Sequence, residues 1–262
     1  MNANGRPSSA IEVTGLAKKY GDKRVLDNVT FSVPWGQICG YLGPNGAGKS
    51  TTIKALAGIA PPDSGSVRIA GHDAFGTTLE SKRRLGYVPE NGGLYGLLTV
   101  EEHIDLVGEL HELPEETFAH RKKELLEGFG LEKLTRRRID SLSKGQRQKT
   151  LLATALLHDP DVLLLDEPLD GLDVTAVRQI KDLLSSLAQA GKAILFCSHI
   201  LDVVERLCDR AIILDQGNIV ADAPTRELVS RSTDKTLESV FHALVRADAV
   251  GLSGLLADGH AK

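Results

Sequence analysis

The chain has 262 residues, of which 42% are hydrophobic and 25% are charged, and its formal net charge is −4. These values are typical of a soluble protein with one large or two small domains, and the lack of a basic excess argues against a nucleic-acid partner. Three scattered cysteines form neither a disulfide framework nor a metal-ligand pattern, which favours the reducing cytoplasm.

No membrane segment is expected, because no apolar stretch approaches the roughly 20 residues that span a bilayer. The N-terminus also lacks the apolar core of a signal peptide. We predict a disordered tail over residues 1–9, a single domain over residues 10–247 and a frayed C-terminal tail over residues 248–262. If the protein serves a membrane process, another chain supplies the membrane part.

The domain opens with segments in which apolar and polar residues alternate. Residues 11–13, 29–33 and 66–69 predict half-buried, antiparallel strands. Tyr20 stands between the first two segments, beside a turn. A turn-flanking tyrosine and a ligand-binding tyrosine are equally consistent with that position.

A glycine-rich motif at residues 43–50 reads Gly-Pro-Asn-Gly-Ala-Gly-Lys-Ser and fits the phosphate-loop pattern G-x-x-x-x-G-K-[ST]. An apolar, strand-like segment precedes it, and residues 51–57 predict a helix that ends at Gly58. Backbone N–H groups of such a loop converge on phosphate at a helix N-terminus. Lys49 would reach the β- and γ-phosphates and Ser50 would ligate Mg²⁺. We therefore predict a nucleoside triphosphate site.

Helical patterns dominate residues 94–157, which follow a strand-like segment at residues 85–88. Thr99 and Glu102 fit a capping box, and residues 115–129 predict a second helix. Ser143 and Gln146 fit another capping box at the start of a third helix. We expect these residues to form a helical insert in an alternating α/β chain.

Two carboxylates, Asp166 and Glu167, follow the continuous apolar run of residues 162–165. Such a run predicts a strand buried on both faces of a parallel sheet, and ligands collect at the carboxyl ends of such strands. Asp166 would hold Mg²⁺ through water, and Glu167 would orient or deprotonate an attacking water. The alternative is an ordinary polar strand end.

A second buried strand, residues 193–197, ends on Ser198 and His199. His199 repeats the placement of the two carboxylates, so a role in the site is favoured over a structural one. Residues 174–190 between them predict a helix. Residues 212–214 and 218–220 predict a hairpin, and residues 237–244 an amphipathic helix.

Together these motifs resemble the ATP-binding subunit of an ATP-binding-cassette (ABC) transporter over nearly the whole chain. Residues 43–50 match the Walker A motif and residues 162–166 the Walker B motif. Residues 142–146, Leu-Ser-Lys-Gly-Gln, stand at the family signature just upstream of Walker B, which makes the match specific. Residues 170–173 resemble the D-loop. The resemblance implies an α/β fold with a phosphate-loop NTPase core on a mainly parallel sheet, an N-terminal antiparallel β subdomain and a helical insert.

The resemblance also implies site roles. It assigns catalysis to Glu167, His199 and Lys49, and binding of Mg²⁺ to Ser50, Asp166 and Glu90. Contacts with ATP are implied for Tyr20 as the adenine-stacking aromatic, and for Gly43, Pro44, Asn45, Gly46, Ala47, Gly48, Lys49, Ser50, Thr51, Glu90, Ser143, Gly145, Gln146 and Asp173.

In this family two subunits dimerise head to tail, and each ATP lies between one Walker A motif and the partner's signature. A homodimer and a pair with a homologous ATPase subunit both stay open. The insert docks a separate integral-membrane permease, so the subunit is expected in the cytoplasm, peripheral on the inner face of the membrane. The residues after the strand at 85–88, the signature and residues 237–241 are similar to bacterial two-component exporters of sodium, drugs or polysaccharides.

Three residues depart from the family pattern. Glu90 stands where a glutamine is usual, and we expect an altered Mg²⁺ dependence. Lys144 replaces the first signature glycine, and it either adds a cation near the partner's γ-phosphate or only decorates a helix start. Asp170 replaces a small hydroxyl residue and has no account from the sequence.

Other functions compete with export as explanations of the sequence. A soluble ABC ATPase of ribosomes usually carries two cassettes, and one acting on DNA carries a long coiled coil, whereas this chain has one Walker A motif and no sustained heptads. A nucleotide-dependent scaffold without activity conflicts with Glu167 and His199. An importer stays possible.

Overall fold

The computed structural model describes residues 6–76 and 79–245. The C-terminal tail predicted from residue 248 and the first five residues of the predicted N-terminal tail lie outside this described part. Residues 6–9 are irregular, but Trp35 Nε1 donates a hydrogen bond to Pro7 O at 2.9 Å. Pro7, which belongs to the segment predicted as a disordered tail, therefore contacts the domain. The described fold begins before residue 10.

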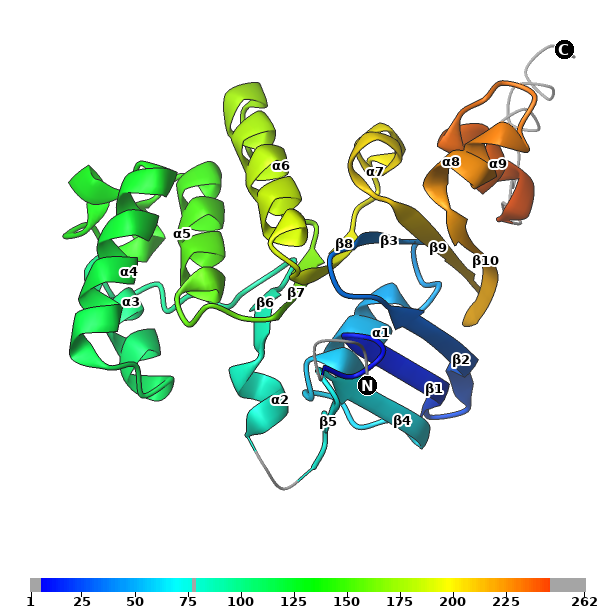
Figure 1. Cartoon of the computed structure of the whole chain (residues 1–262), viewed down its shortest axis with the longest axis horizontal. Coiled ribbons are helices and arrows are strands. Elements are labelled where there is room, and N and C mark those ends of the chain that lie inside the picture. The colour runs from blue at the N-terminus through cyan, green and yellow to red at the C-terminus, as the bar shows by residue number, and fades with distance from the viewer. Residues whose placement is uncertain (1–5, 77–78, 246–262) are drawn as a thin grey trace, which may run out of the picture.

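The main sheet has the strand order β10-β9-β3-β8-β7-β6 (Figure 1). Its members are β3 (Ile38–Leu42), β6 (Leu85–Val88), β7 (Val162–Asp166), β8 (Ala193–Cys197), β9 (Arg210–Asp215) and β10 (Asn218–Pro224). All neighbours pair in parallel except β9 and β10, which form the predicted closing hairpin. The mainly parallel α/β core expected from the sequence is confirmed.

The strand β7 shows why a continuous apolar run suits this sheet. Its residues are all buried, with Leu163 and Leu165 in one hydrophobic cluster and Val162 and Leu164 in another. Because successive side chains of a strand point to opposite faces, both faces of β7 must be covered.

A second, antiparallel sheet covers one of those faces, with the order β2-β1-β4-β5. It consists of β1 (Ile11–Tyr20), β2 (Lys23–Val33), β4 (Ser64–Ile69) and β5 (His72–Asp73). Its apolar face shares a core with α1 (Lys49–Leu56) and with the main sheet. This is the N-terminal β subdomain that the sequence predicts.

Helices cover the other face and extend beyond the edge strand β6 (Figure 1). The described helices after α1 are α2 (Glu80–Arg83), α3 (Val100–Leu110), α4 (Glu115–Phe129), α5 (Lys144–Leu156), α6 (Val174–Gln189), α7 (Leu201–Leu207), α8 (Thr225–Ser230) and α9 (Leu237–Leu244), with single 3₁₀ turns at Glu132–Leu134 and Ile139–Ser141. None of the helices in these two described segments is long and apolar enough to cross a bilayer.

The helical insert α3–α5 begins its first and third helices with the two predicted capping boxes. The Thr99 hydroxyl accepts a hydrogen bond from Glu102 N at 3.2 Å, and Ser143 accepts one from Gln146 N at 3.2 Å. Each side chain satisfies a backbone donor that the first helical turn leaves without a partner.

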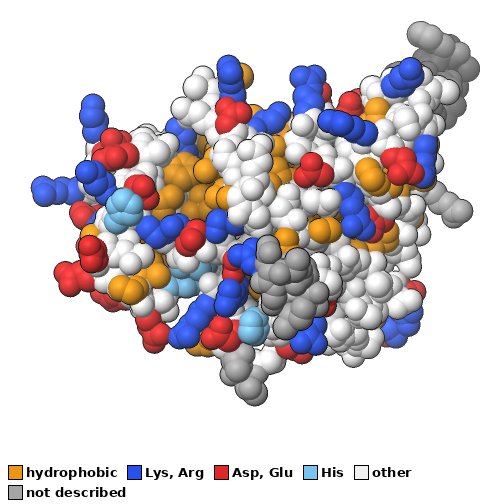
Figure 2. Space-filling model, in the orientation of Figure 1, with side chains coloured by type: hydrophobic (Ala, Val, Ile, Leu, Met, Phe, Trp, Pro, Cys, Tyr) orange, Lys and Arg blue, Asp and Glu red, His pale blue; other side chains and the backbone are white. Residues whose placement is uncertain are grey.

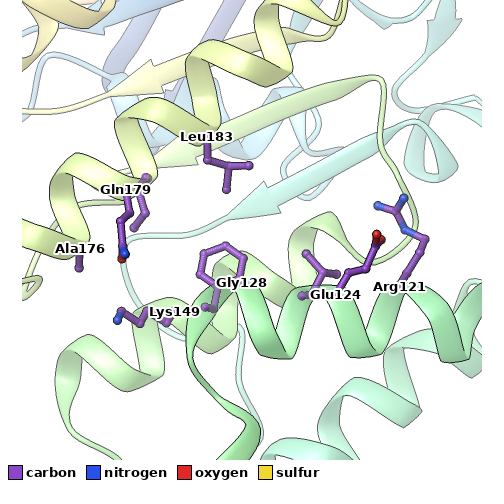
Figure 3. A pocket seen from close by; sticks show the side chains of 10 residues that line it. Arg121, Glu124, Gly128, Lys149, Ala176, Gln179 and Leu183 are labelled. Carbon is purple, nitrogen blue, oxygen red and sulfur yellow. The ribbon is translucent and has the colours of Figure 1, made fainter.

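An apolar groove of about 240 Å³ separates the insert from α6. Its lining includes Leu125 and Phe129 of α4 and Ile180 of α6. Figure 3 shows Leu183 of α6 and Arg121 of α4 among the residues that line it. Hydrophobic side chains are visible in the hollow between these elements in Figure 2.

Two glycines near the end of α4 differ in backbone conformation, so substitutions at them should have opposite effects on stability. A methyl group added at Gly128 or at Gly130 would meet no atom within 4 Å, but Gly130 has φ +66°. Gly128→Ala should raise the free energy of unfolding by about 0.5–1 kcal/mol, because alanine favours helix. Gly130→Ala should lower it by about 1 kcal/mol, because an L-residue is strained there. Urea unfolding of both variants measures these changes, and two changes of the same sign would contradict this account.

Candidate functional site

A cavity of about 510 Å³ lies at the carboxyl ends of β3, β7 and β8. In an open parallel sheet this is where ligands bind. Its described lining residues are Val25, Asn45, Gly46, Gly48, Lys49, Ser50, Thr51, Glu90, Asp166, Glu167, Asp170 and His199. The structure thus brings the phosphate loop, both carboxylates and the histidine predicted from the sequence into one cavity.

The glycines of the loop after β3 are required by close approach as well as by conformation. A methyl group at Gly43 would lie 2.4 Å from Leu214 O, and one at Gly48 would lie 2.6 Å from Leu26 Cδ2. Gly48 also has φ +111°. The loop is therefore held directly against β9 and β2. Within it, Ala47 N donates a hydrogen bond to Pro44 O at 3.2 Å.

The start of α1 is suited to an anion. Gly48 is its N-cap residue and gives no side-chain cap, so the first backbone N–H groups keep their capacity for a ligand. Lys49 Nζ donates to Gly43 O at 2.7 Å and to Pro44 O at 3.1 Å, which places the ammonium over the loop. A cation and a helix N-terminus together favour phosphate.

Asp166 is a buried carboxylate at the end of β7, with 6% of its surface exposed. Burial and the neighbouring charges of Glu90 and Glu167 raise the pKa of its carboxyl to about 6. With the Ser50 hydroxyl and Glu90 in the same cavity, the donor set is all oxygen. That chemistry fits Mg²⁺, which proteins usually hold by one or two carboxylates together with substrate phosphates.

Glu167 adopts a left-handed backbone conformation, with φ +50°. A non-glycine residue there carries strain of the order of 1 kcal/mol, and such residues gather at functional sites. Its Oε2 accepts a hydrogen bond from Ser198 Oγ at 3.2 Å and lies 3.0 Å from His199 Nδ1. The carboxylate is thus oriented by two side chains from the end of β8, as a general base requires.

Other predicted residues stand outside the described lining of this cavity. Ser143, Gly145 and Gln146 lie at the N-terminus of α5, and Gln146 Oε1 accepts a hydrogen bond from Ser143 N at 3.0 Å. Asp173 is the N-cap of α6 and accepts from Ala176 N at 2.9 Å. Tyr20 ends β1 with 52% of its surface exposed, and Lys18 Nζ lies 5.6 Å from its ring centroid.

Two lining residues were not selected as site residues from the sequence. Val25 lies in β2, which begins at Lys23, whereas the sequence predicts this strand only over residues 29–33. No sequence pattern marks Val25 as a site residue. The sequence marks Asp170 only as a departure from the family pattern, although its position four residues after Asp166 is a signal that places it near the carboxyl end of β7.

The raised pKa of Asp166 predicts a pH-dependent stability of the nucleotide-free protein in chelator. The carboxyl titrates near 3.8 when unfolded and near 6 when folded, so stability falls as the pH rises through this window. Asp166→Asn removes the buried charge and should raise the free energy of unfolding at pH 7.5 by about 1–3 kcal/mol, with little gain at pH 4. Denaturant unfolding at both pH values measures this. A gain that does not depend on pH would contradict the assignment.

Comparison with known proteins identifies the family of the chain. Residues 26–170 match the protein family described as ABC transporter. The chain is 39% identical over 231 residues to the Nod factor export ATP-binding protein I of Ralstonia nicotianae, covering 88% of this chain and 72% of that protein. It is 36% identical over 247 residues to the daunorubicin/doxorubicin resistance ATP-binding protein of Streptomyces peucetius, covering 94% and 75%.

Solved structures give the same result. A structure described as an ATP binding subunit of an ABC transporter superposes with a TM-score of 0.84 at 33% identity, and the match covers 90% of this chain and 99% of the other. The family match, the curated relatives and the solved structure agree, and the chain is an ATP-binding subunit of the ABC transporter family.

Proposed function

We propose that this subunit hydrolyses ATP in the cavity beside Lys49 and Glu167 and thereby drives export through a separate membrane permease. The observation that carries the proposal is the oriented Glu167 carboxylate, 3.0 Å from His199 Nδ1, in the same cavity as the phosphate loop. The direction of transport rests on relatives named for Nod factor export and for drug resistance. We place the subunit at the inner face of the membrane, held there by the permease.

The residues of the cavity divide into three tasks: phosphate binding, metal binding and proton transfer. Lys49 and the N-terminus of α1 bind the phosphates, and Ser50, Asp166 and Glu90 would hold Mg²⁺. That ion, when bound, neutralises charge on the phosphates. Glu167 takes a proton from the attacking water, and His199 with Ser198 keeps its carboxylate pointing at the reacting region.

A second copy, or a homologous subunit, completes the site in this proposal. The N-terminus of α5, with Ser143, Gly145 and Gln146, is another helix start but lies outside the described lining of its own cavity. A head-to-tail arrangement would present it to the partner's nucleotide as a second phosphate clamp. Tyr20, exposed at the end of β1, and Asp173 keep their expected contacts with nucleotide and partner as part of this proposal.

This subunit offers the permease a surface between its core and its helical insert. A cavity of about 580 Å³ there is lined by Tyr87 of β6, Val107 of α3 and Leu151 of α5, among others. Ile59, which belongs to this lining, is 60% exposed, and Leu110 of α3, outside the described lining, is 70% exposed. Such a cavity gives a partner apolar side chains to contact, and it is lined in part by the insert that the family uses for docking.

Glu167→Gln should bind ATP without turning it over, because the amide cannot accept the proton of the attacking water. With ATP and Mg²⁺ we expect its solution mass to double relative to the nucleotide-free protein, while the unaltered protein stays a monomer. Light scattering after size-exclusion chromatography measures this, and Lys49→Ala in the same background is the control that should remain a monomer.

The outcomes separate the parts of the proposal. A variant that hydrolyses ATP at the unaltered rate would remove Glu167 from catalysis. A monomer that binds ATP in both forms would mean that closure needs the permease or a different partner subunit.

Glu90→Gln tests the metal side of the site. Glu90 adds negative charge beside Asp166, so its removal should shift the Mg²⁺ concentration for half-maximal ATPase activity by a few-fold, without abolishing activity. A Mg²⁺ titration at saturating ATP measures the shift. Identical titration curves for the two proteins would show that Glu90 does not affect the metal.

A further inference from the structure

The N-terminus of α5 is attached to the loop that follows Glu167 by several contacts within one chain. Lys144 Nζ lies 2.6 Å from Asp170 Oδ2, and Gln148 Nε2 donates to Pro168 O at 3.0 Å. A methyl group on Gly145 would lie 3.0 Å from Gly171 O. The two residues that depart from the family pattern at these motifs are therefore partners of each other.

The packing around this ion pair fixes where the lysine side chain runs. Gly171 has φ +74°, and a methyl group there would lie 2.6 Å from Lys144 Cδ. The methylene chain of Lys144 thus lies along the backbone of Gly171 and delivers its ammonium to Asp170. A side chain at residue 171 would displace it.

Asp170 also lines the nucleotide cavity, where Glu90, Asp166 and Glu167 already supply three carboxylates. Its backbone N–H donates to Glu167 O at 3.2 Å, so it stands at the Glu167 end of the cavity. The hydrogen bond from Lys144 is the largest of the effects that lower the pKa of the Asp170 carboxyl, which stays charged at neutral pH. Without a cation this charge would face the phosphates of a bound nucleotide.

We propose that Lys144 and Asp170 act as one positioning unit, which neutralises the fourth carboxylate of the cavity and ties the signature helix α5 to the catalytic loop. The inference rests on the proposed nucleotide site and adds to it a role for this chain's own departures from the family pattern. Neither residue is a catalytic residue. Lys144 acts on the nucleotide through Asp170.

The test compares four proteins: the unaltered chain, Lys144→Gln, Asp170→Asn and the double variant. Lys144→Gln leaves Asp170 without its cation and should weaken ATP binding about three- to fivefold, in the range of an exposed ion pair. Adding Asp170→Asn should restore the Kd to within about twofold of the unaltered protein. Calorimetric titration with MgATP in the Glu167→Gln background measures binding without turnover.

A titration with MgADP distinguishes this role from a general structural one. Because Asp170 stands at the Glu167 end of the cavity, Lys144→Gln should weaken ADP binding less than ATP binding. Lys144→Arg should keep the affinity for both. Lys123→Gln and Glu127→Gln alter an exposed ion pair on α4, at 3.9 Å, and should change neither.

Three results would overturn the proposal. These are losses that add up in the double variant, an equal loss for ATP and ADP, or unchanged ATP affinity in Lys144→Gln. If Lys144→Gln does not fold, Asp170→Asn alone decides, because removal of the negative charge should leave ATP binding at least as strong. Lys49→Ala distinguishes failure of the proposed nucleotide site from failure of the ion-pair proposal. If Lys49→Ala still binds ATP normally, the proposed site is wrong. If it loses ATP binding, the site stands and a negative result for Lys144 contradicts only the role of the ion pair.

Discussion

The parallel register of β3, β8 and β7 brings the chemistry of this protein together. Cys197 of β8 pairs with Tyr41 of β3 on one side and with Asp166 of β7 on the other. The phosphate loop, Glu167 and Ser198 each begin one or two residues after these partners, so they leave the sheet at one edge. A shift of this register by one residue would turn each side chain to the opposite face. The buried, two-sided core is what holds the register and hence the site.

The same arrangement concentrates negative charge where an anionic nucleotide must bind. Asp166 is desolvated, and Glu90 and Glu167 act on it through their charges. Lys49, the free N–H groups of α1 and a bound Mg²⁺ would offset this repulsion when ATP is present. The protein without ligand therefore contains unfavourable electrostatics that ligand binding relieves, which links occupancy of the site to its stability.

Much of the fold and the centre of the site can be predicted from short stretches of sequence, because the residues that determine them lie close together in the chain. Thr99 and Ser143 cap their helices through residues three positions away, and the apolar run before Asp166 predicts its buried strand directly. The contacts of Val25 and Lys144 could not be predicted, because each depends on a segment distant in the chain that the fold brings near. The sequence alone does not decide whether Lys144 contacts a phosphate or only decorates a helix start, because its ion pair with Asp170 spans 26 positions. Tyr20 remains a prediction, since the described cavity lining does not include it.

The backbone of Glu167 has a consequence for engineering. Glycine occupies a left-handed conformation without strain, so a glycine at this position would relieve the backbone strain that Glu167 carries. A selection for heat resistance that ignores turnover would therefore favour loss of the very carboxylate on which hydrolysis depends. At this residue stability and activity are opposed, and any thermostable variant of this subunit has to gain its stability elsewhere in the chain.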